Sequence, residues 1–575
     1  MHQKMKNNFI VQIVTYLLAA LLLCGCANQQ PPEGGPIDRT TPEIVSTYPD
    51  SSSMLNFKNH NIRLVFDRYV NERSVEDAIF ISPTINALEF DWSGKELEMT
   101  FSDTLRPNTT YVINIGTDVE DLIKNKMAHA FTFAFSTGKE IDRGAVEGRV
   151  YPRNNGDEIS GIMIFAYRLD GTDPDTLNPI KDKPDFITQT GKNGNFFLHH
   201  IPFGRYRVFA IRDEYRNLVY DREIDEFAVQ SGKIELIPSD SIRTDVFMKL
   251  AKEDTTGPRL MKVTALNQTH IIAEFSEPIN PSTVRLSSFT VVDTVNQNHL
   301  DLFLSYPVPA SSNSFFVITQ KQDSGRVFRL SVKDVTDSTG NKINPLANSF
   351  LFRSSLKADT LRPGVVSVSI KDSALAVDLQ PVLTITFSDG VAKSTSLDWL
   401  YLFDDNKKQI QAEKKWMSDA VISLRPEKEL QSHTRYTLRA ELRSVHDWAG
   451  RVCLDSTKAW HFETLDIEDL SSVEGTIFDD NKIDTTGQLF VSATQIGRST
   501  PKHYVVPADA TGKFIIPQIA EGSYVFQSFR DRNGNGKYDS GNPFPFVYSE
   551  RFSMVSDTLK IRARWPLEGV KIMMK

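Results

Sequence analysis

The segment from Asp531 to Asp539 carries the side chains best suited to chemistry, because oxygen-bearing groups recur there at every second position. Its five candidate ligands are, in order, Asp531, Asn533, Asn535, Lys537 and Asp539. Side-chain oxygens at positions 1, 3 and 5, a backbone carbonyl at 7 and a carboxylate at 9 match the first half of a calcium-binding loop, and Gly536 permits the sharp turn. The loop is therefore a candidate Ca²⁺ site, and the sequence indicates no other cofactor.

Two interpretations of this loop stay open. Its twelfth position is Asn542 rather than a bidentate glutamate, and no helical pattern flanks it, so a helix-loop-helix calcium site is excluded. A weak calcium site completed by Glu550 or water is one interpretation. The other is a glycine-rich β-turn whose Asn and Asp side chains satisfy nearby backbone groups. The related segment 213–221 has Tyr215 and Leu218 at its third and sixth positions, which predicts that this earlier copy is free of metal.

Motifs of established catalytic chemistry are missing from the sequence. We find no Gly-x-Ser-x-Gly nucleophile elbow, no Gly-Lys-Ser/Thr phosphate loop, no His-Glu-x-x-His zinc motif and no Gly-x-Gly-x-x-Gly dinucleotide motif. The adjacent His199 and His200 fall in a predicted strand, where neighbouring side chains point to opposite faces, so they cannot chelate one metal together. We expect a protein that is not an enzyme, and an enzyme with an unrecognised site is the less favoured alternative.

Tryptophan is the remaining candidate for ligand binding, since exposed aromatic rings on a β-sandwich face can stack on sugars. Single tryptophans at strand positions are core residues in most sandwiches. Trp416 and Trp448 differ because charged and polar residues surround them in the sequence, so they are candidate ligand residues. They support a second reading of the chain as a glycan-binding accessory lipoprotein.

The amino-terminal residues indicate export and anchoring. Two lysines precede an apolar run over residues 9–23, which is the pattern of a secretory signal rather than of a full bilayer span. Residues 23–26, Leu-Cys-Gly-Cys, resemble the lipobox of bacterial lipoproteins. The resemblance implies cleavage after residue 25 and a diacylglyceryl group on Cys26, and Ala27 implies an outer-membrane destination. The alternative is an ordinary cleaved signal peptide.

The composition is that of a multidomain globular protein. The chain has 575 residues, of which 24% are charged and 40% hydrophobic, and this length predicts about three to five domains. With 65 basic and 73 acidic residues and no basic cluster, it lacks the electrostatic footprint of a nucleic-acid-binding protein. Three cysteines are too few for a disulfide framework.

Short runs with period-two alternation, bounded by Gly, Pro, Asn and Asp, dominate from residue 62 onward, so we predict an all-β fold. Three segments begin with a proline-containing lead-in and a strand that ends in Phe and polar residues: Ile62–Asp67, Ile271–Glu277 and Leu383–Asp389. Each continues with an aromatic strand and a turn related to Asp-x-x-Gly-Asn, complete only at 337–341. These segments resemble the bacterial Ig-like domain of the S-layer type, which implies three Ig-like β-sandwiches.

A second repeat occurs twice. The interval from Gly194 to Gly204 equals that from Gly512 to Gly522, and the next aspartate follows nine residues later in both copies. The motif Ile-x-x-Gly-x-Tyr spans the second glycine of each pair. Both copies resemble the transthyretin-like regulatory domain of carboxypeptidases, although Ala520 replaces the usual proline in the later one. The resemblance implies seven-stranded sandwiches that serve as structural or interaction modules.

The repeats divide the chain into seven segments. We predict a signal peptide over 1–25, a tether over 26–40, Ig-like domains over 41–138, 257–355 and 360–465, and transthyretin-like domains over 144–250 and 471–575. Short joints predict a semi-rigid rod or bent string of touching domains. The whole resembles a bacterial lipoprotein of the Bacteroidetes type. We expect a lipid-anchored cell-envelope array with a structural, adhesion or partner-binding role, whose partners are the membrane and an unidentified envelope protein or glycan.

Overall fold

A computed structural model describes residues 38–50, 54–85, 88–171, 173–393, 397–479, 485–498, 501–555 and 557–574. The signal segment and Cys26 lie outside these residues. The prediction of an all-β fold is confirmed, because the described chain consists of β-strands with one short helix, α2 (Glu72–Glu76), and four single turns of 3-10 helix. Within the described residues, no helix has the length and apolar character required to cross a membrane.

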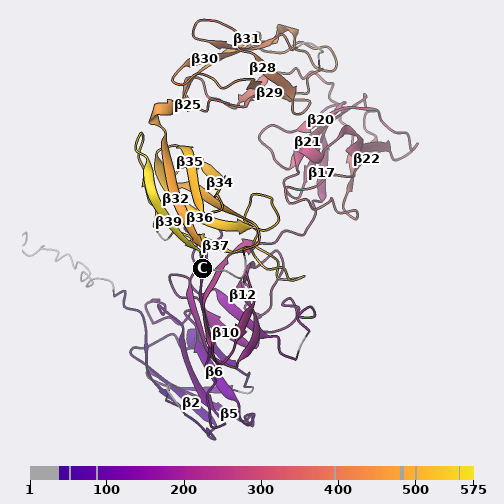
Figure 1. Cartoon of the computed structure of the whole chain (residues 1–575). Helices are drawn as coiled ribbons and strands as arrows, with labels where there is room; N and C mark the ends of the chain where they lie inside the picture. The colour runs from indigo at the N-terminus through magenta and orange to yellow at the C-terminus, as the bar shows by residue number, and fades with distance from the viewer. Residues whose placement is uncertain are drawn as a thin grey trace, which may run out of the picture.

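The strands form five β-sandwiches along the chain, which we number as the first to fifth domains (Figure 1). The first, third and fourth have the same order of neighbouring strands across their sheets, except that the fourth has one additional edge strand. The first domain contains β1 (Ile44–Tyr48), β2 (Asn61–Phe66), β5 (Glu96–Phe101) and β4 (Leu88–Ser93), opposite β3 (Ile79–Ser82), β6 (Thr110–Ile115) and β7 (Phe131–Ser136). The third contains β17 (Leu260–Ala265), β18 (His270–Phe275), β21 (Ser314–Thr319) and β20 (Leu302–Pro307), opposite β19 (Phe289–Asp293), β22 (Val327–Val332) and β23 (Ser349–Arg353). The fourth contains β24 (Val365–Val368), β26 (Leu383–Phe387), β29 (Val421–Pro426) and β28 (Ala412–Trp416), opposite β25 (Ala374–Val377), β31 (Thr457–Thr464), β30 (Arg435–Glu441) and β27 (Leu400–Asp404).

The second and fifth domains share a different order. The second contains β11 (Asn195–Ile201), β8 (Gly144–Tyr151) and β15 (Ile242–Lys249), opposite β10 (Phe186–Gln189), β9 (Met163–Arg168), β12 (Gly204–Arg212), β13 (Glu226–Val229) and β16 (Ala251–Lys252), with β14 (Ile234–Leu236) paired to β12. The fifth contains β35 (Lys513–Ile519), β32 (Ser471–Asp479) and β39 (Leu567–Met574), opposite β34 (His503–Pro507), β33 (Gln488–Ile496), β36 (Gly522–Asp531) and β37 (Phe552–Met554), with β38 (Leu559–Ile561) paired to β36. In both, the first strand has a parallel neighbour from near the end of the domain, β15 beside β8 and β39 beside β32.

The sequence patterns have direct physical causes in these sheets. Along β2, Ile62, Leu64 and Phe66 are buried in the core of the first domain while the residues between them face outward, as strand alternation requires. In the second domain, a Cβ on Gly148 would lie 2.0 Å from the carbonyl oxygen of Val246 on the parallel neighbour, β15. Gly475 meets its own parallel neighbour in the same way. Close approach of the last strand therefore demands glycine in both copies.

The first two domains share a core. Val112 and Ala134, on β6 and β7 of the first domain, belong to the apolar cluster that fills the second domain. Phe80, on β3, packs against the second apolar cluster of that domain. The side chain of Thr117 donates a hydrogen bond to the carbonyl of Thr190 at 3.1 Å. This continuous packing makes the first two domains one body.

The fifth domain folds back onto the second, although about 300 residues separate the contacting segments. The docking loop, residues 540–549, connects the Asp531 loop to β37 and reaches the second domain. Ser549 donates from its backbone amide to the carbonyl of Gln230 at 3.3 Å and from its hydroxyl to the carbonyl of Val229 at 3.0 Å. Figure 1 shows the yellow fifth domain resting on the second, so that domains two to five form a closed circuit. The predicted string of touching domains is thus bent back on itself by a contact between non-consecutive domains, which the sequence did not predict.

Candidate metal loops and domain junctions

The Asp531 loop is a compact turn built around one buried carboxylate. Asp531 ends β36 and is 2% exposed. One of its oxygens accepts from the amides of Gly534 at 2.7 Å and Asn535 at 3.3 Å, and the other accepts from Gly536 at 2.7 Å. Both glycines have positive φ, +78° and +71°, where side chains are strained. The loop thus needs its glycines to wrap the backbone around Asp531.

Three of the predicted ligands meet, because Asn533 and Asn535 both lie against Asp539. Asp539 accepts hydrogen bonds at one carboxylate oxygen from the side-chain amides of Asn533 at 2.6 Å and Asn535 at 2.9 Å. The amide of Lys537 donates to Asn535 at 2.7 Å. In this arrangement the Asn nitrogens face Asp539, so a bound cation would require both amides to turn and present their oxygens.

Glu550 follows the docking loop in the sequence and contacts the Asp531 loop through its carboxylate. Its carboxylate accepts from the amides of Arg532 at 2.7 Å and Asp539 at 3.1 Å, and the residue is 3% exposed. Burial raises the pKa of Glu550, the two amide hydrogen bonds act against it, and the negative charges of Asp539 and Asp531 add to the rise. Glu550 is therefore a buried carboxylate that two backbone amides hold beside the loop.

The earlier copy has the same construction. Asp213 accepts from the amides of Asn217 at 3.2 Å and Leu218 at 2.8 Å, and the Asn217 side chain donates to Asp221 at 2.8 Å. Asp225 takes the role of Glu550, accepting from the amides of Glu214 at 3.0 Å and Asp221 at 2.8 Å. Carboxylate oxygens of Asp213, Asp221 and Asp225 lie within 4.8 Å of one another.

Burial and the neighbouring carboxylates both affect the pKa of Asp225. It is fully buried, and burial raises its pKa to about 6, with Asp213 and Asp221 adding to the rise against the two amide hydrogen bonds. Sequence comparison missed Asp225, because it follows the loop after four residues whereas Glu550 follows after eleven. The docking loop accounts for that difference. The earlier copy thus offers as many carboxylates as the later one, and its predicted freedom from metal stays a prediction.

The two candidate tryptophans lie in different environments. Trp416 is half-buried on β28 and packs against the core of the fourth domain, with its ring 6.3 Å from those of Phe387 and Trp399. Trp448 stacks on Phe303 of the third domain at 4.9 Å and 22°. Both indole N–H groups are buried without a hydrogen-bond acceptor. Protein neighbours therefore cover part of each ring, and the structure does not join the two into one sugar-binding platform.

The junction between the third and fourth domains is apolar at its centre and charged beside it. Tyr306, Phe316, Ile318 and Ala420 form a buried cluster across the two domains. The fully buried His270 lies 3.0 Å from Asp389 through Nε2, and the hydroxyl of Tyr306 donates to the same carboxylate at 2.7 Å. Burial acts to raise the pKa of Asp389, but the hydrogen bond and charge of His270, together with Tyr306, outweigh it and lower the pKa.

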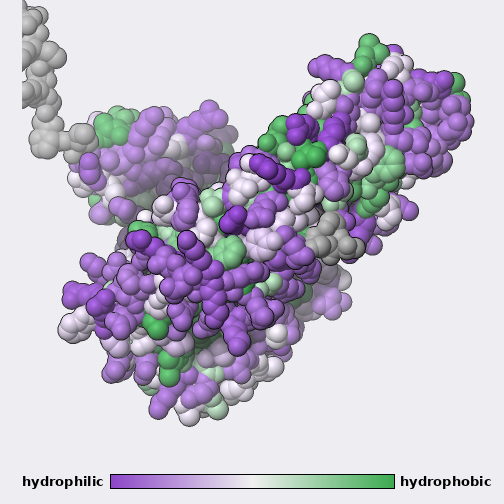
Figure 2. Space-filling model, turned by 90° about the horizontal axis from the view of Figure 1, so that it is seen from above, coloured by the Kyte–Doolittle hydropathy of each residue, from purple (hydrophilic) through white to green (hydrophobic). Residues whose placement is uncertain are grey.

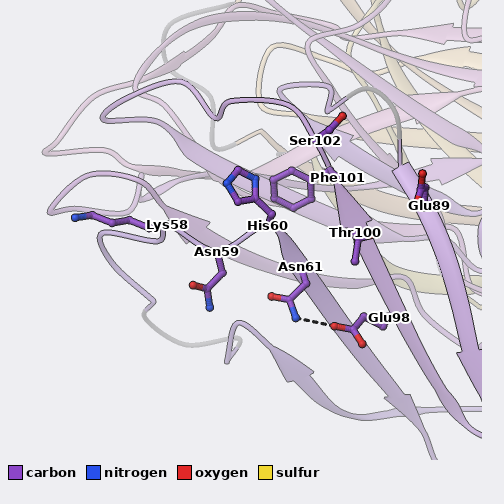
Figure 3. A pocket seen from close by; sticks show the side chains of 9 residues that line it. All are labelled: Lys58, Asn59, His60, Asn61, Glu89, Glu98, Thr100, Phe101 and Ser102. Atoms are coloured by element: carbon purple, nitrogen blue, oxygen red, sulfur yellow. Dashed lines mark hydrogen bonds between the residues drawn. The ribbon is translucent and has the colours of Figure 1, made fainter.

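A polar hollow of about 660 Å³ opens on the first domain beside β2 and β5 (Figure 3). Its lining consists of Lys58, Asn59, His60, Asn61, Glu89, Glu98, Thr100, Phe101 and Ser102. The Asn61 side chain donates to Glu98 at 2.7 Å, and the His60 ring packs near Phe101 at 5.6 Å. The hollow offers hydrogen-bonding groups to a polar ligand.

Comparison with known proteins identifies part of the chain. Residues 38–137 and 359–464 match the bacterial Ig-like domain, which confirms the Ig-like prediction for the first and fourth domains. The third domain lies outside these matches but has the strand order of the first.

Two curated proteins are similar over short stretches. An S-layer protein of Geobacillus stearothermophilus is 35% identical over 86 residues, which cover 15% of this chain and 6% of that protein. An outer cell wall protein of Brevibacillus brevis is 26% identical over 148 residues, which cover 26% of this chain and 13% of that protein. The chain therefore spans a small part of the length of these relatives.

Among solved structures, domains 1–6 of the surface layer protein SbsC align at 10% identity and a TM-score of 0.17, covering 92% of this chain and 68% of that one. An L,D-transpeptidase from Mycobacterium tuberculosis aligns at 12% identity and a TM-score of 0.15, covering 37% of this chain and 88% of that one.

Proposed function

We propose that this chain is a lipid-anchored, non-catalytic structural protein of the cell envelope, which holds β-sandwich domains in fixed relation and presents them to an envelope protein or glycan. The proposal rests on one observation: buried polar groups form hydrogen bonds across the domain junctions. His270 and Asp389 join the third domain to the fourth, and Ser549 joins the fifth to the second. Such groups position whole domains relative to one another.

The visible face is of the kind expected for an anchored protein that does not self-associate. Figure 2 shows a face that is mostly hydrophilic, with apolar residues in small separate patches. Large continuous apolar patches would favour self-association. The two curated relatives are named as an S-layer protein and an outer cell wall protein, which supports placing this chain in the cell envelope as well.

Anchoring rests on Cys26, through the resemblance of residues 23–26 to a lipobox. Cys26→Ala should abolish incorporation of a labelled fatty acid and move the protein from the membrane fraction to the soluble fraction. Cys453→Ala is the matched control, since Cys453 is buried in the fourth domain and should leave fractionation unchanged. Persistence of Cys26→Ala in the membrane fraction would contradict the lipid anchor and the proposed outer-membrane location.

We propose that the Asp531 loop holds a weakly bound Ca²⁺, with Asp531, Asn533, Asn535, the Lys537 carbonyl and Asp539 as ligands and Glu550 beside them. The contacts of Asn533 and Asn535 with Asp539, beside the buried Asp531 and Glu550, support this proposal. Millimolar Ca²⁺ should raise the melting temperature of the intact chain, and Asp539→Asn should reduce the rise. Asp557→Asn is a control outside the loop. An Asp539→Asn variant with the full rise would remove the loop as a metal site.

A further inference from the structure

A turn between β6 and β7 carries apolar side chains at the surface of the first domain. Leu122 is 70% exposed and Ile123 is 58% exposed. Asp121, the residue before them, pairs with Val70 in an isolated antiparallel bridge. This bridge places Tyr69, which is 58% exposed, across from Leu122. We call Tyr69, Leu122 and Ile123 the apolar tip of the first domain.

The same turn occurs in the third and fourth domains and allows a direct comparison. In each of the three domains, an aspartate pairs with the residue four positions after the final Phe of the second strand. The amide of that aspartate donates to the carbonyl four residues later. The turn aspartates are Asp121, Asp337 and Asp447. The next position is therefore equivalent in the three domains, and it holds Leu122, Ser338 and Trp448.

In the fourth domain, these tip positions form the contact with the preceding domain. Trp448 stacks on Phe303 of the third domain at 4.9 Å. Gly390 follows the final Phe of its strand by three residues, as Tyr69 does in the first domain. A Cβ on Gly390 would lie 2.8 Å from the ring of Tyr306, so the third domain covers this position as well. The tip of such a domain can therefore serve as a docking surface.

The tips of the three domains differ in polarity and in cover. The third domain has Ser338 and Thr339 at its tip, and both are exposed polar residues that require no cover. The first domain has apolar side chains there, as the fourth has Trp448, yet within the described chain no other domain covers Leu122 and Ile123. The apolar tip therefore has the character of a contact surface without its contact.

The chain that follows Cys26 enters the first domain beside this tip. Asn125, in the same turn, donates to the carbonyl of Asp38 at 3.1 Å. Arg68 lies 3.4 Å from the carboxylate of Asp38 and donates to the carbonyl of Thr40 at 3.0 Å. These bonds hold the entry point of the chain against the turn.

The distance from the anchor to this entry point is bounded by the length of the chain. Asp38 follows Cys26 by 12 positions. An extended chain covers at most about 3.3–3.6 Å per residue, so Asp38 lies within about 40 Å of Cys26. A lipid on Cys26 therefore keeps the apolar tip close to the membrane surface.

We propose that the apolar tip inserts into the headgroup region of the membrane that holds the lipid anchor. This inference rests on the proposed anchor at Cys26. Tyr69 suits the headgroup region because its ring is apolar and its hydroxyl is polar. The ammonium of Lys95 lies 5.8 Å from the Tyr69 ring, and lysine covers apolar surface with its stem while its charged end reaches polar groups.

Insertion of the tip would orient the first domain on the bilayer. A lipid on Cys26 alone leaves the domain free to swing about its tether. A second attachment at Leu122 and Ile123 restricts that rotation, because the two attachments lie on either side of the segment from Cys26 to Asp38. The domains that follow would then project from the membrane in a defined direction.

The test places a fluorescent NBD label at the tip of the full-length protein. Leu122→Cys is labelled and reconstituted into phosphatidylethanolamine–phosphatidylglycerol vesicles in which some headgroups carry a nitroxide quencher. The label should lose most of its emission. Ser338→Cys, at the same turn position in the third domain, is the matched control and should keep its emission. The unsubstituted chain should take up no label, because Cys26 is acylated in the proposed function and Cys453 is buried.

A second arm tests the tip without the anchor. The Cys26→Ala chain with labelled Leu122→Cys is mixed with the same vesicles at millimolar lipid concentration, where quenching should persist. Adding Ile123→Ser should raise the lipid concentration required for quenching by about tenfold, since it removes an apolar side chain from the inserted surface. Leu122 and Ile123 are exposed, so these substitutions leave the core of the domain intact.

The outcomes separate the tip from the anchor. Quenching at residue 122 but not at residue 338 supports insertion, whereas no quenching at residue 122 in either arm, or equal quenching at both positions, overturns it. A label at residue 122 that is shielded from aqueous iodide before vesicles are added would show that protein covers the tip, and would also overturn the proposal. Uptake of label by Cys26 in the unsubstituted chain would refute the anchor, and the Cys26→Ala arm would still decide the tip.

Discussion

Phe546, in the docking loop, is the residue whose removal should most clearly open the contact between the fifth and second domains. Its ring packs 5.9 Å from that of Phe209, and the Arg207 guanidinium lies 3.8 Å from its centre. Arg207 is 6% exposed and donates to the carbonyl of Pro174 at 2.6 Å, so it is held in place from the other side. An aromatic pair contributes about 1 kcal/mol and a desolvated cation–π contact about 1–2 kcal/mol. Phe546→Ala should therefore weaken docking by about 2–3 kcal/mol, or roughly 30- to 140-fold in the closed-to-open ratio.

Hydrogen exchange of the Ser549 amide measures this directly, since that amide donates to Gln230 only when the domains are docked. Its protection should fall by the same factor in Phe546→Ala, while amides inside β36 keep theirs. Val547→Ala is the matched control, because Val547 is the next residue and is 55% exposed. Equal protection of the Ser549 amide in Phe546→Ala and the wild type would refute the reasoning.

The remaining predictions concern pH and the junction between the third and fourth domains. Because the pKa of Asp225 is about 6 in the folded chain and near 3.8 when exposed, the folded state binds the proton more tightly, so this group lowers stability as pH rises from about 4 to 6. Urea unfolding in calcium-free buffer should show that decline, and Asp225→Asn should flatten it; an unchanged slope would contradict the burial argument. Trp448→Ala removes the stack on Phe303 and should destabilise the third and fourth domains by about 1 kcal/mol in thermal unfolding, whereas Trp565→Ala, 73% exposed, should change little. Loss of polysaccharide binding in Trp448→Ala without loss of stability would instead favour the glycan-binding role.

Local patterns in the sequence predicted local structure well. Alternation along Ile62, Leu64 and Phe66 predicted a strand with one buried face, and the structure has it. Gly194 and Gly512 marked a repeat in the sequence, and the structure gives the steric cause, since a Cβ at either position would lie 2.3 Å from a carbonyl oxygen of the neighbouring strand. Three of the candidate calcium ligands, Asn533, Asn535 and Asp539, also lie together, since they belong to one turn.

Contacts between distant segments were not predictable in the same way. Phe546 and Phe209 are 337 residues apart, and no local pattern pairs them. Trp448 has polar neighbours in the sequence, yet it stacks on Phe303 because the third domain covers it. Periodicity reports which face of a strand is buried, but not which domain buries it.

Small-angle X-ray scattering of the intact chain distinguishes a scaffold whose domains are held in a closed circuit from an extended array. We predict a compact particle whose scattering matches domains two to five in contact, and which expands in Phe546→Ala. An elongated wild-type particle, with the fifth domain distant from the second, would contradict the account.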